Sequence, residues 1–167
     1  MKYLVRQNLF ENFDLQHKQY LSWKRKNVTI RGIKSAKYGD ENNAGAMLGR
    51  GLYTAALSNK QLAKQYGTVY YVLNAIPKHP KVFNTLNDWE IWEYNTLICN
   101  YLKGKGHTGY IDKRDFSKYT TLEDAIMELG YDGVIIKGRE MVNYKPENVL
   151  YFNDDYDLER YYETHIM

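Results

Sequence analysis

One stretch of the sequence, from Gly49 to Gly67, combines residue types that could build a ligand-binding site. It reads GRGLYTAALSNKQLAKQYG and predicts a glycine turn, a short strand and a helix that begins at Ser58 or Asn59. Glycine lets a backbone approach a ligand closely, and the strand would hold the ring of Tyr53 beside that ligand. A β–α corner with ordinary core tyrosines has the same pattern. The stretch alone therefore predicts a candidate binding position without indicating the ligand.

A second candidate group, Arg31 and Gly32, lies inside a predicted strand over residues 27–33, NVTIRGI. Glycine within a strand often marks a point at which another group approaches the backbone. The neighbouring guanidinium supplies a planar fork of donors for phosphate or ribose oxygens. An exposed arginine at a β-bulge is the other interpretation of the same two residues.

Length and composition favour one soluble, cytoplasmic domain without a metal. The chain has 167 residues, a formal net charge of +3 and a single cysteine, Cys99, so no internal disulfide can form. No Cys/His cluster has zinc-ligand spacing, and no apolar run has the length of a membrane span. We therefore expect no metal, no signal peptide and no membrane partner. The net charge is too small to indicate nucleic acid, although basic residues gather at 18–26.

The hydrophobic pattern predicts an α+β fold with a mixed or antiparallel sheet. The expected strands are 27–33, 52–54, 68–76, 133–137, 141–144 and 149–152, with a short edge piece at 82–83. The expected helices are one or two short ones within 6–23 that pack on the back of the domain, then 58–66, 88–102, 120–130 and a C-terminal helix or frayed tail. Residues 34–48 and 104–119 are predicted to be loops.

Three separated segments resemble the motifs of the ADP-ribosyltransferases, especially the diphtheria-toxin and poly-ADP-ribose-polymerase branch. Gly49–Gly67 is similar to the central Gly-x-Gly-(Ile/Leu)-Tyr-x-Ala motif that leads into a helix with a second Tyr. Arg31-Gly32 resembles the His-Gly or Arg-Gly pair of the first motif. Glu140–Val149, EMVNYKPENV, resembles the third motif, in which a catalytic Glu opens a strand. Residues 131–135, YDGVI, resemble small domains of this family in phage and mobile-element proteins.

The resemblance covers about residues 28–152 and implies one domain, 1–167, with a core at about 27–153 built on a split mixed or antiparallel sheet. It implies that NAD is the substrate, with its nicotinamide carboxamide on the backbone of Gly32 and its ring stacked on Tyr53 and covered by Tyr66. The carboxylate of Glu140 would stabilise the oxocarbenium-like transition state formed as nicotinamide leaves. Arg31 would hold ribose or pyrophosphate oxygens. The implied cofactor-binding set is Arg31, Gly32, Tyr53, Thr54 and Tyr66, with Glu140 as the catalytic residue and no metal.

The departures from the family pattern restrict the expected reaction. Arg31 stands where the tyrosine-containing branch usually has His, which favours transfer of a single ADP-ribose unit over polymer formation. Arginine-specific relatives carry a second Glu two positions before the catalytic one, and this chain has Gly138 there. We therefore expect a mono-ADP-ribosyltransferase whose acceptor is a macromolecule other than an arginine side chain, more often protein than nucleic acid, in the cytoplasm of the cell, or of the host if the chain is phage-encoded.

Several alternatives stay open at this stage. The chain could be a catalytically inactive binding protein of the same fold, or an NAD glycohydrolase in which water is the acceptor. A nucleic-acid binder that uses its tyrosines and basic residues is a third, while the related RNA 2'-phosphotransferase relies on an Arg/His/Arg/Arg set that this chain lacks. Two carboxylates compete with Glu140 for the catalytic role: Glu147 follows a proline at a turn, and Asp132 is expected to cap a turn at the start of a strand.

Overall fold

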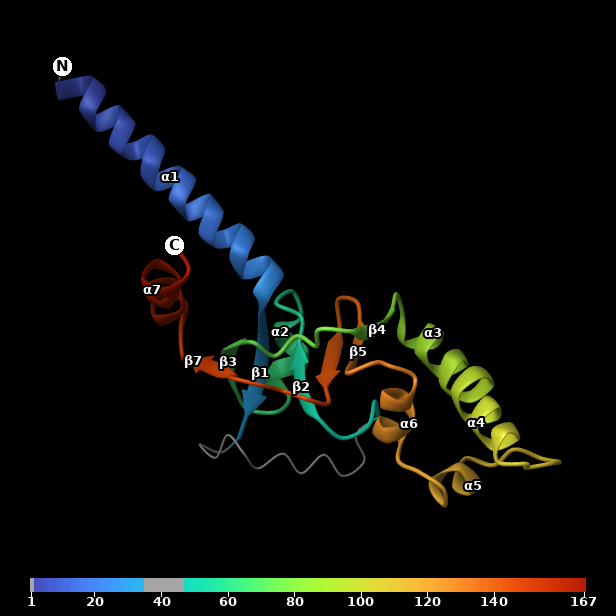
Figure 1. The fold of residues 1–167 in the computed structure, drawn as a ribbon. Coiled ribbons are helices and arrows are strands. Elements are labelled where there is room, and N and C mark those ends of the chain that lie inside the picture. The colour runs from blue at the N-terminus through green and yellow to red at the C-terminus, as the bar shows by residue number, and fades with distance from the viewer. Residues whose placement is uncertain (1, 35–46) are drawn as a thin grey trace.

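The computed structural model describes residues 2–34 and 47–167, with the side chains of 13–34 and 47–167. These residues form a mixed seven-stranded sheet with helices around it (Figure 1), in the order β4-β5-β6-β2-β1-β3-β7. All neighbouring strands are antiparallel except β4 and β5, which confirms the α+β class and the mixed sheet. The strands are β1 (Val28–Ile33), β2 (Leu52–Ala55), β3 (Thr68–Leu73), β4 (Pro80–Phe83), β5 (Gly133–Ile136), β6 (Glu140–Asn143) and β7 (Leu150–Phe152).

The centre of the sheet is a narrow junction between β1 and β2. Strand β1 pairs with β3 along its whole length, and β2 pairs with β6 along its whole length. By contrast, the described part of β1 pairs with β2 at one position, where Ile30 lies opposite Ala55. The sheet therefore consists of two halves, β4-β5-β6-β2 and β1-β3-β7, that are joined at this pair.

Separate groups of helices cover the two halves of the sheet. The helical segment between β4 and β5 packs on the first half, where Trp89, Ile98 and Val142 are fully buried in one cluster. Helices α1 and α7 meet β1 and β3 in a second cluster around Tyr20. The helices are α1 (Lys2–Asn27), α2 (Lys60–Lys64), α3 (Leu86–Ile91), the π-helix η1 (Trp92–Ile98), α4 (Cys99–Gly104), α5 (Lys113–Ser117), α6 (Leu122–Glu128) and α7 (Asp155–His165).

The predicted helices differ from the observed ones in three places. Residues 2–27 form one long helix that points away from the sheet in Figure 1, not one or two short helices packed on the back of the domain. The helix predicted at 88–102 begins at Leu86 instead, because the side chain of Thr85 accepts a hydrogen bond from the backbone N–H of Asp88. Helix α5, capped by Asp112, lies within the predicted loop 104–119.

Other predicted elements agree with the structure or lie outside the described residues. Asn59, one of the two predicted start residues, caps α2, and Thr121 caps α6 at the start of the helix predicted at 120–130. The edge piece at 82–83 is part of β4. Strand β3 ends at Leu73 and not at residue 76, because Asn74 has a left-handed backbone with a φ of 64°. Most of the predicted loop 34–48 falls on residues 35–46, which the structure does not describe. None of the described helices combines the length and apolar character needed to cross a membrane.

Helix α2 packs directly on the backbone of β1 at Gly32. A Cβ atom built on this glycine would come within 1.8 Å of the carbonyl oxygen of Ala63 and 3.2 Å of the backbone nitrogen of Gly67. Real Cβ atoms do not approach backbone so closely, so only glycine fits between β1 and α2. The packing of α2 is therefore sufficient to explain why a glycine interrupts this strand.

Replacing Gly32 by alanine should destabilise the protein by about 3 kcal/mol, because α2 must move away from β1 to make room for the methyl group. Chemical denaturation of Gly32→Ala measures this loss. Gly104→Ala is the matched control, since a Cβ there meets nothing within 4 Å and alanine favours the helical conformation. Equal effects of the two substitutions would contradict the packing of α2 on Gly32.

Candidate functional site

The register of β2 and β6 brings Tyr53 and Glu140 to the same face of the sheet. Tyr53 lies opposite Val142, and Ala55 lies opposite Glu140. Side chains alternate along a strand and paired residues share a face, so Glu140 is a diagonal neighbour of Tyr53 on that face. Ile30, which pairs with Ala55, extends the same face into β1. The predicted catalytic carboxylate and the predicted stacking ring thus meet beside the junction of the two half-sheets.

Glu140 is the first residue of β6, as the third motif predicts. Its side chain is 15% exposed, and its carboxylate lies 3.5 Å from the guanidinium of Arg139. The chain before it is fixed, because the backbone N–H of Ala56 donates to the carbonyl of Arg139. Glu140 therefore presents a partly buried carboxylate at the end of a well-anchored strand.

The hydroxyl of Tyr53 is held by the turn that precedes its own strand. It accepts a hydrogen bond of 2.9 Å from the backbone N–H of Leu48 and donates one of 2.5 Å to the carbonyl of Gly49. Burial raises the pKa of Tyr53 well above its usual range, and the charges of Glu140 and Glu123 raise it further, while the Leu48 N–H lowers it. The ring is packed against the first core cluster, so its position is fixed by the protein itself.

Two other predicted site residues, Arg31 and Thr54, lie on the opposite face of the sheet from Glu140. Both are neighbours in sequence of the Ile30–Ala55 pair, and alternation along each strand turns them to the other side. The guanidinium of Arg31 donates to the hydroxyl of Tyr151 at 3.2 Å. Thr54 is buried, and its hydroxyl has no hydrogen-bond partner among the described residues. The six predicted residues therefore do not gather on one face.

Tyr66 lies in the turn after α2, with a side chain that is 58% exposed. Helix α2 ends at Lys64, two residues earlier than Tyr66, whose backbone N–H donates to the carbonyl of Ala63. Its charge is a minor contribution to the raised pKa of Tyr53, after burial and the charges of Glu140 and Glu123. The structure therefore shows Tyr66 as an exposed ring after α2 and, within its described part, gives no contact between this ring and Glu140.

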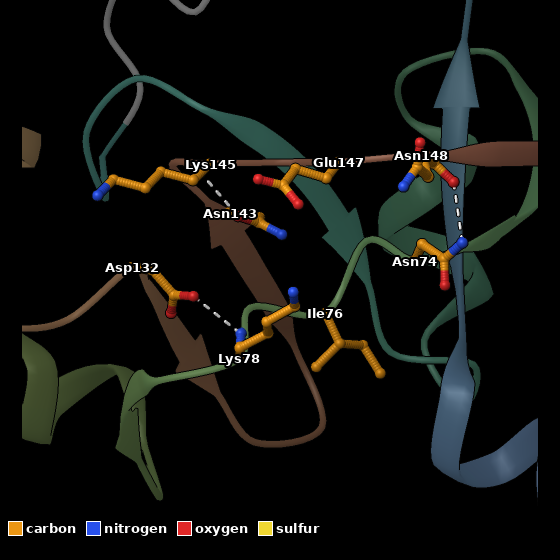
Figure 2. A pocket seen from close by; sticks show the side chains of 8 residues that line it. All are labelled: Asn74, Ile76, Lys78, Asp132, Asn143, Lys145, Glu147 and Asn148. Atoms are coloured by element: carbon orange, nitrogen blue, oxygen red, sulfur yellow. Dashed lines mark hydrogen bonds between the residues drawn. The ribbon is translucent and has the colours of Figure 1, made fainter.

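The rival carboxylates, Glu147 and Asp132, both line a pocket at the other end of β6. Asp132 caps a turn as predicted, since its two oxygens accept the backbone N–H groups of Lys78 and His79. Glu147 is exposed and lies in the segment after β6, whereas Glu140 begins that strand. The pocket has a volume of about 350 Å³ and is lined by Asn74, Ile76, Lys78, Asp132, Asn143, Lys145, Glu147 and Asn148 (Figure 2).

Sequence reasoning missed two features of these sites. It did not assign a role to Tyr151, whose hydroxyl accepts from Arg31, because the registers of β1, β3 and β7 together place the two residues on one face. It also overlooked the asparagines Asn74, Asn143 and Asn148. Asparagine is disfavoured within strands, so Asn74 and Asn143 inside the predicted strands 68–76 and 141–144 were the available signal. Among the described residues, no group of three His, Cys, Asp or Glu side chains could hold a metal ion.

Removing the Tyr53 hydroxyl should destabilise the protein by about 1–2 kcal/mol, because the Leu48 N–H then loses its acceptor. Chemical denaturation of Tyr53→Phe measures the loss, and Tyr66→Phe, at an exposed ring, is the matched control. A Tyr53→Phe variant as stable as the control would show that the turn at 48–51 does not depend on this hydroxyl.

The free energy of unfolding should fall as the pH rises above about 10, where tyrosines of an unfolded chain ionise. Burial raises the pKa values of Tyr53 and Tyr144 above this range, and burial together with Asp155 does so for Tyr20. The folded protein therefore retains protons that the unfolded chain loses, and each such tyrosine contributes a slope of about 1.4 kcal/mol per pH unit. In Tyr144→Phe, the free energy of unfolding should fall less steeply with pH, as measured by denaturation at several alkaline pH values. An unchanged slope would contradict the raised pKa of Tyr144.

The first site therefore offers a carboxylate, Glu140, and a phenol ring, Tyr53, near the junction of the half-sheets. Such a pair can stabilise a positive charge that develops beside an aromatic ring. The second offers a polar pocket that contains charges of both signs. Comparisons of the chain with protein-family models, with curated proteins and with solved structures find no match.

Proposed function

We propose that the protein is an NAD-dependent mono-ADP-ribosyltransferase in which Glu140 is the catalytic residue. The observation that carries this proposal is the position of Glu140, which opens β6 and lies diagonally beside Tyr53 on one face of the sheet. A carboxylate is useful there because the bond between nicotinamide and ribose breaks with its electron pair leaving on the nicotinamide nitrogen. The ribose carbon then carries positive charge until a nucleophile of the acceptor bonds to it and releases a proton to solvent.

The electrostatic contribution of Glu140 is large enough to matter for the rate. Two opposite unit charges about 4 Å apart attract by about 4 kcal/mol at an effective dielectric constant of 20. The side chain is 15% exposed, so water screens it less than a surface carboxylate. Arg139, 3.5 Å away, competes for the same carboxylate, and its side chain is exposed enough to turn toward solvent when a substrate binds.

The narrow junction supports the finer proposal of a split sheet of the ADP-ribosyltransferase type. Beyond the Ile30–Ala55 pair, β1 pairs only with β3 and β2 pairs only with β6 in the described part of the chain. The other residues of β1 and β2 at the junction are therefore not paired with each other. NAD would place its nicotinamide ribose at Glu140, beside the rings of Tyr53 and Tyr66. Arg31 lies on the opposite face of the sheet from Glu140. It would therefore contact the phosphates of NAD only if the dinucleotide passed around the edge of β1 to that face.

Gly32 lends this proposal no independent support. The carbonyl of Ala63 occupies the space in which a side chain at this position would lie, so the glycine is required for the packing of α2 alone. The proposal therefore rests on Glu140 and Tyr53. We further propose that the acceptor is a macromolecule in the cytoplasm, and that it is a protein in preference to a nucleic acid.

Glu140→Gln should leave NAD binding intact and lower the release of nicotinamide from NAD by about two to three orders of magnitude, the usual cost of losing one preorganised electrostatic group. The measurement is release of labelled nicotinamide together with transfer of labelled ADP-ribose to proteins of a cell lysate. Glu163→Gln, at an exposed position of α7, is the matched control. Thermal melts of each variant show whether the fold is retained.

The outcomes distinguish the alternatives. Nicotinamide release without labelled acceptor would indicate an NAD glycohydrolase, and NAD binding without turnover would indicate an inactive binding protein. Loss of activity in Glu147→Gln while Glu140→Gln stays active would show that the other carboxylate is catalytic. Absence of NAD binding at about 1 mM, equivalent to a binding free energy weaker than about −4 kcal/mol, would remove the proposal.

A further inference from the structure

The polar pocket around Glu147 is separate from the site of Glu140. Its buried wall is formed by Asn143, the last residue of β6, which is three positions from Glu140 and therefore on the opposite face. At about 3.3 Å per residue, the two positions are about 10 Å apart along the strand. A ligand in this pocket would thus not compete with one that lies on Glu140.

The backbone around the pocket is held together by hydrogen bonds from side chains that line it. The buried amide of Asn143 donates to the carbonyl of Ala75 at 3.1 Å and accepts from the backbone N–H of Lys145 at 2.9 Å. The carboxylate of Asp132 accepts two backbone N–H groups of residues 78 and 79. These bonds connect the segments after β3, before β5 and after β6, so the pocket is formed before any ligand arrives.

Two of the lining asparagines have an unusual backbone. Asn74 and Asn148 have φ values of 64° and 55°, and they are the non-glycine residues with positive φ in the described part of the chain. The side chain of Asn74 donates to the carbonyl of Asn148 at 2.9 Å, which connects the two loops directly. Asparagine tolerates the left-handed region better than most residues, and the bond between the two loops holds both asparagines in it.

Four charged side chains line the pocket, Lys78, Lys145, Asp132 and Glu147, and two of them face each other. In Figure 2 the side chain of Lys78 points toward Asn143 and Glu147, and the carboxylate of Glu147 points back toward it, while Lys145 extends away. Within the described residues, neither Lys78 nor Glu147 has an ion-pair partner within 4.0 Å. Asp132 is already satisfied by backbone donors. Lys78 and Glu147 are therefore the positive and the negative group that a ligand between them would meet.

We propose that this pocket binds a small zwitterion of the size of a free α-amino acid. The ammonium of such a ligand would bind Glu147, and its carboxylate would bind Lys78 through charge-assisted hydrogen bonds. The carboxylate of Glu147 would repel a simple anion, and the ammonium of Lys78 would repel a simple cation. Neither kind of ion could therefore bind favourably to both groups. A volume of about 350 Å³ is within the range of small-molecule sites.

The test is isothermal titration calorimetry of the full chain with glycine, L-alanine and L-glutamine. We expect at least one of them to bind, and we expect L-alaninamide and N-acetyl-L-alanine, which each lack one charge, to bind more weakly by about tenfold. Glu147→Gln and Lys78→Gln should each weaken binding by a similar factor. Glu163→Gln and Lys103→Gln, at exposed positions outside the pocket, are the matched controls and should bind as the unmodified chain does.

Three results would overturn the proposal. The first is no heat of binding for any of the three amino acids at about 10 mM with folded protein. The second is equal binding of alanine and its two blocked forms, which would mean that the charges do not select the ligand. The third is binding of inorganic phosphate that Glu147→Gln leaves unchanged, which would indicate an anion site. Glu140→Gln should bind the amino acid normally, so failure of the proposed transferase reaction leaves this test intact.

Discussion

The contact between the carbonyl of Ala63 and the backbone of Gly32 is the constraint on which the first site depends. It seats α2 on β1 without an intervening side chain. The segment that leads into α2 in turn reaches the hairpin between β5 and β6, because the amide of Asn59 donates to the carbonyl of Gly138 at 3.4 Å. Glu140 follows Gly138 by two residues. The packing of α2 on β1 and the position of the Glu140 carboxylate are therefore connected through this hydrogen bond.

The backbone of the turn before Glu140 disfavours a glutamate at position 138. Gly138 has a φ of 69°, a left-handed conformation that a glutamate would adopt only with strain. The backbone N–H of Arg139 donates to the carbonyl of Ile136, so the turn that requires this conformation is tight. A second Glu at position 138 would therefore have to be accommodated by a different connection between β5 and β6. The hairpin therefore gives a local reason for a glycine at position 138, whatever the function of the chain.

The sequence predicted elements better than it predicted which side chains share a face. Period-two patterns located the strands, and the capping residues Asn59 and Thr121 located two helix starts, because both signals are local. The opposite orientation of Arg31 and Glu140 depends on the registers of β1, β2 and β6 together, which no single segment encodes. The short helix α5 was missed because its five residues carry too little periodicity to stand out in a polar stretch.

Both sites depend on the same register of β6. A slip of one residue against β2 would turn Glu140 away from Tyr53 and would turn Asn143 out of the polar pocket at the same time. Two features oppose such a slip: Val142 is fully buried in the first core cluster, and the hydroxyl of Tyr144 donates to the carbonyl of Leu48 at 2.6 Å. That carbonyl belongs to the residue whose N–H binds the Tyr53 hydroxyl, so one turn holds a residue of β2 and the residue after β6 together. The two sites lie on opposite faces, and substitutions in them should act independently as long as this shared register is kept.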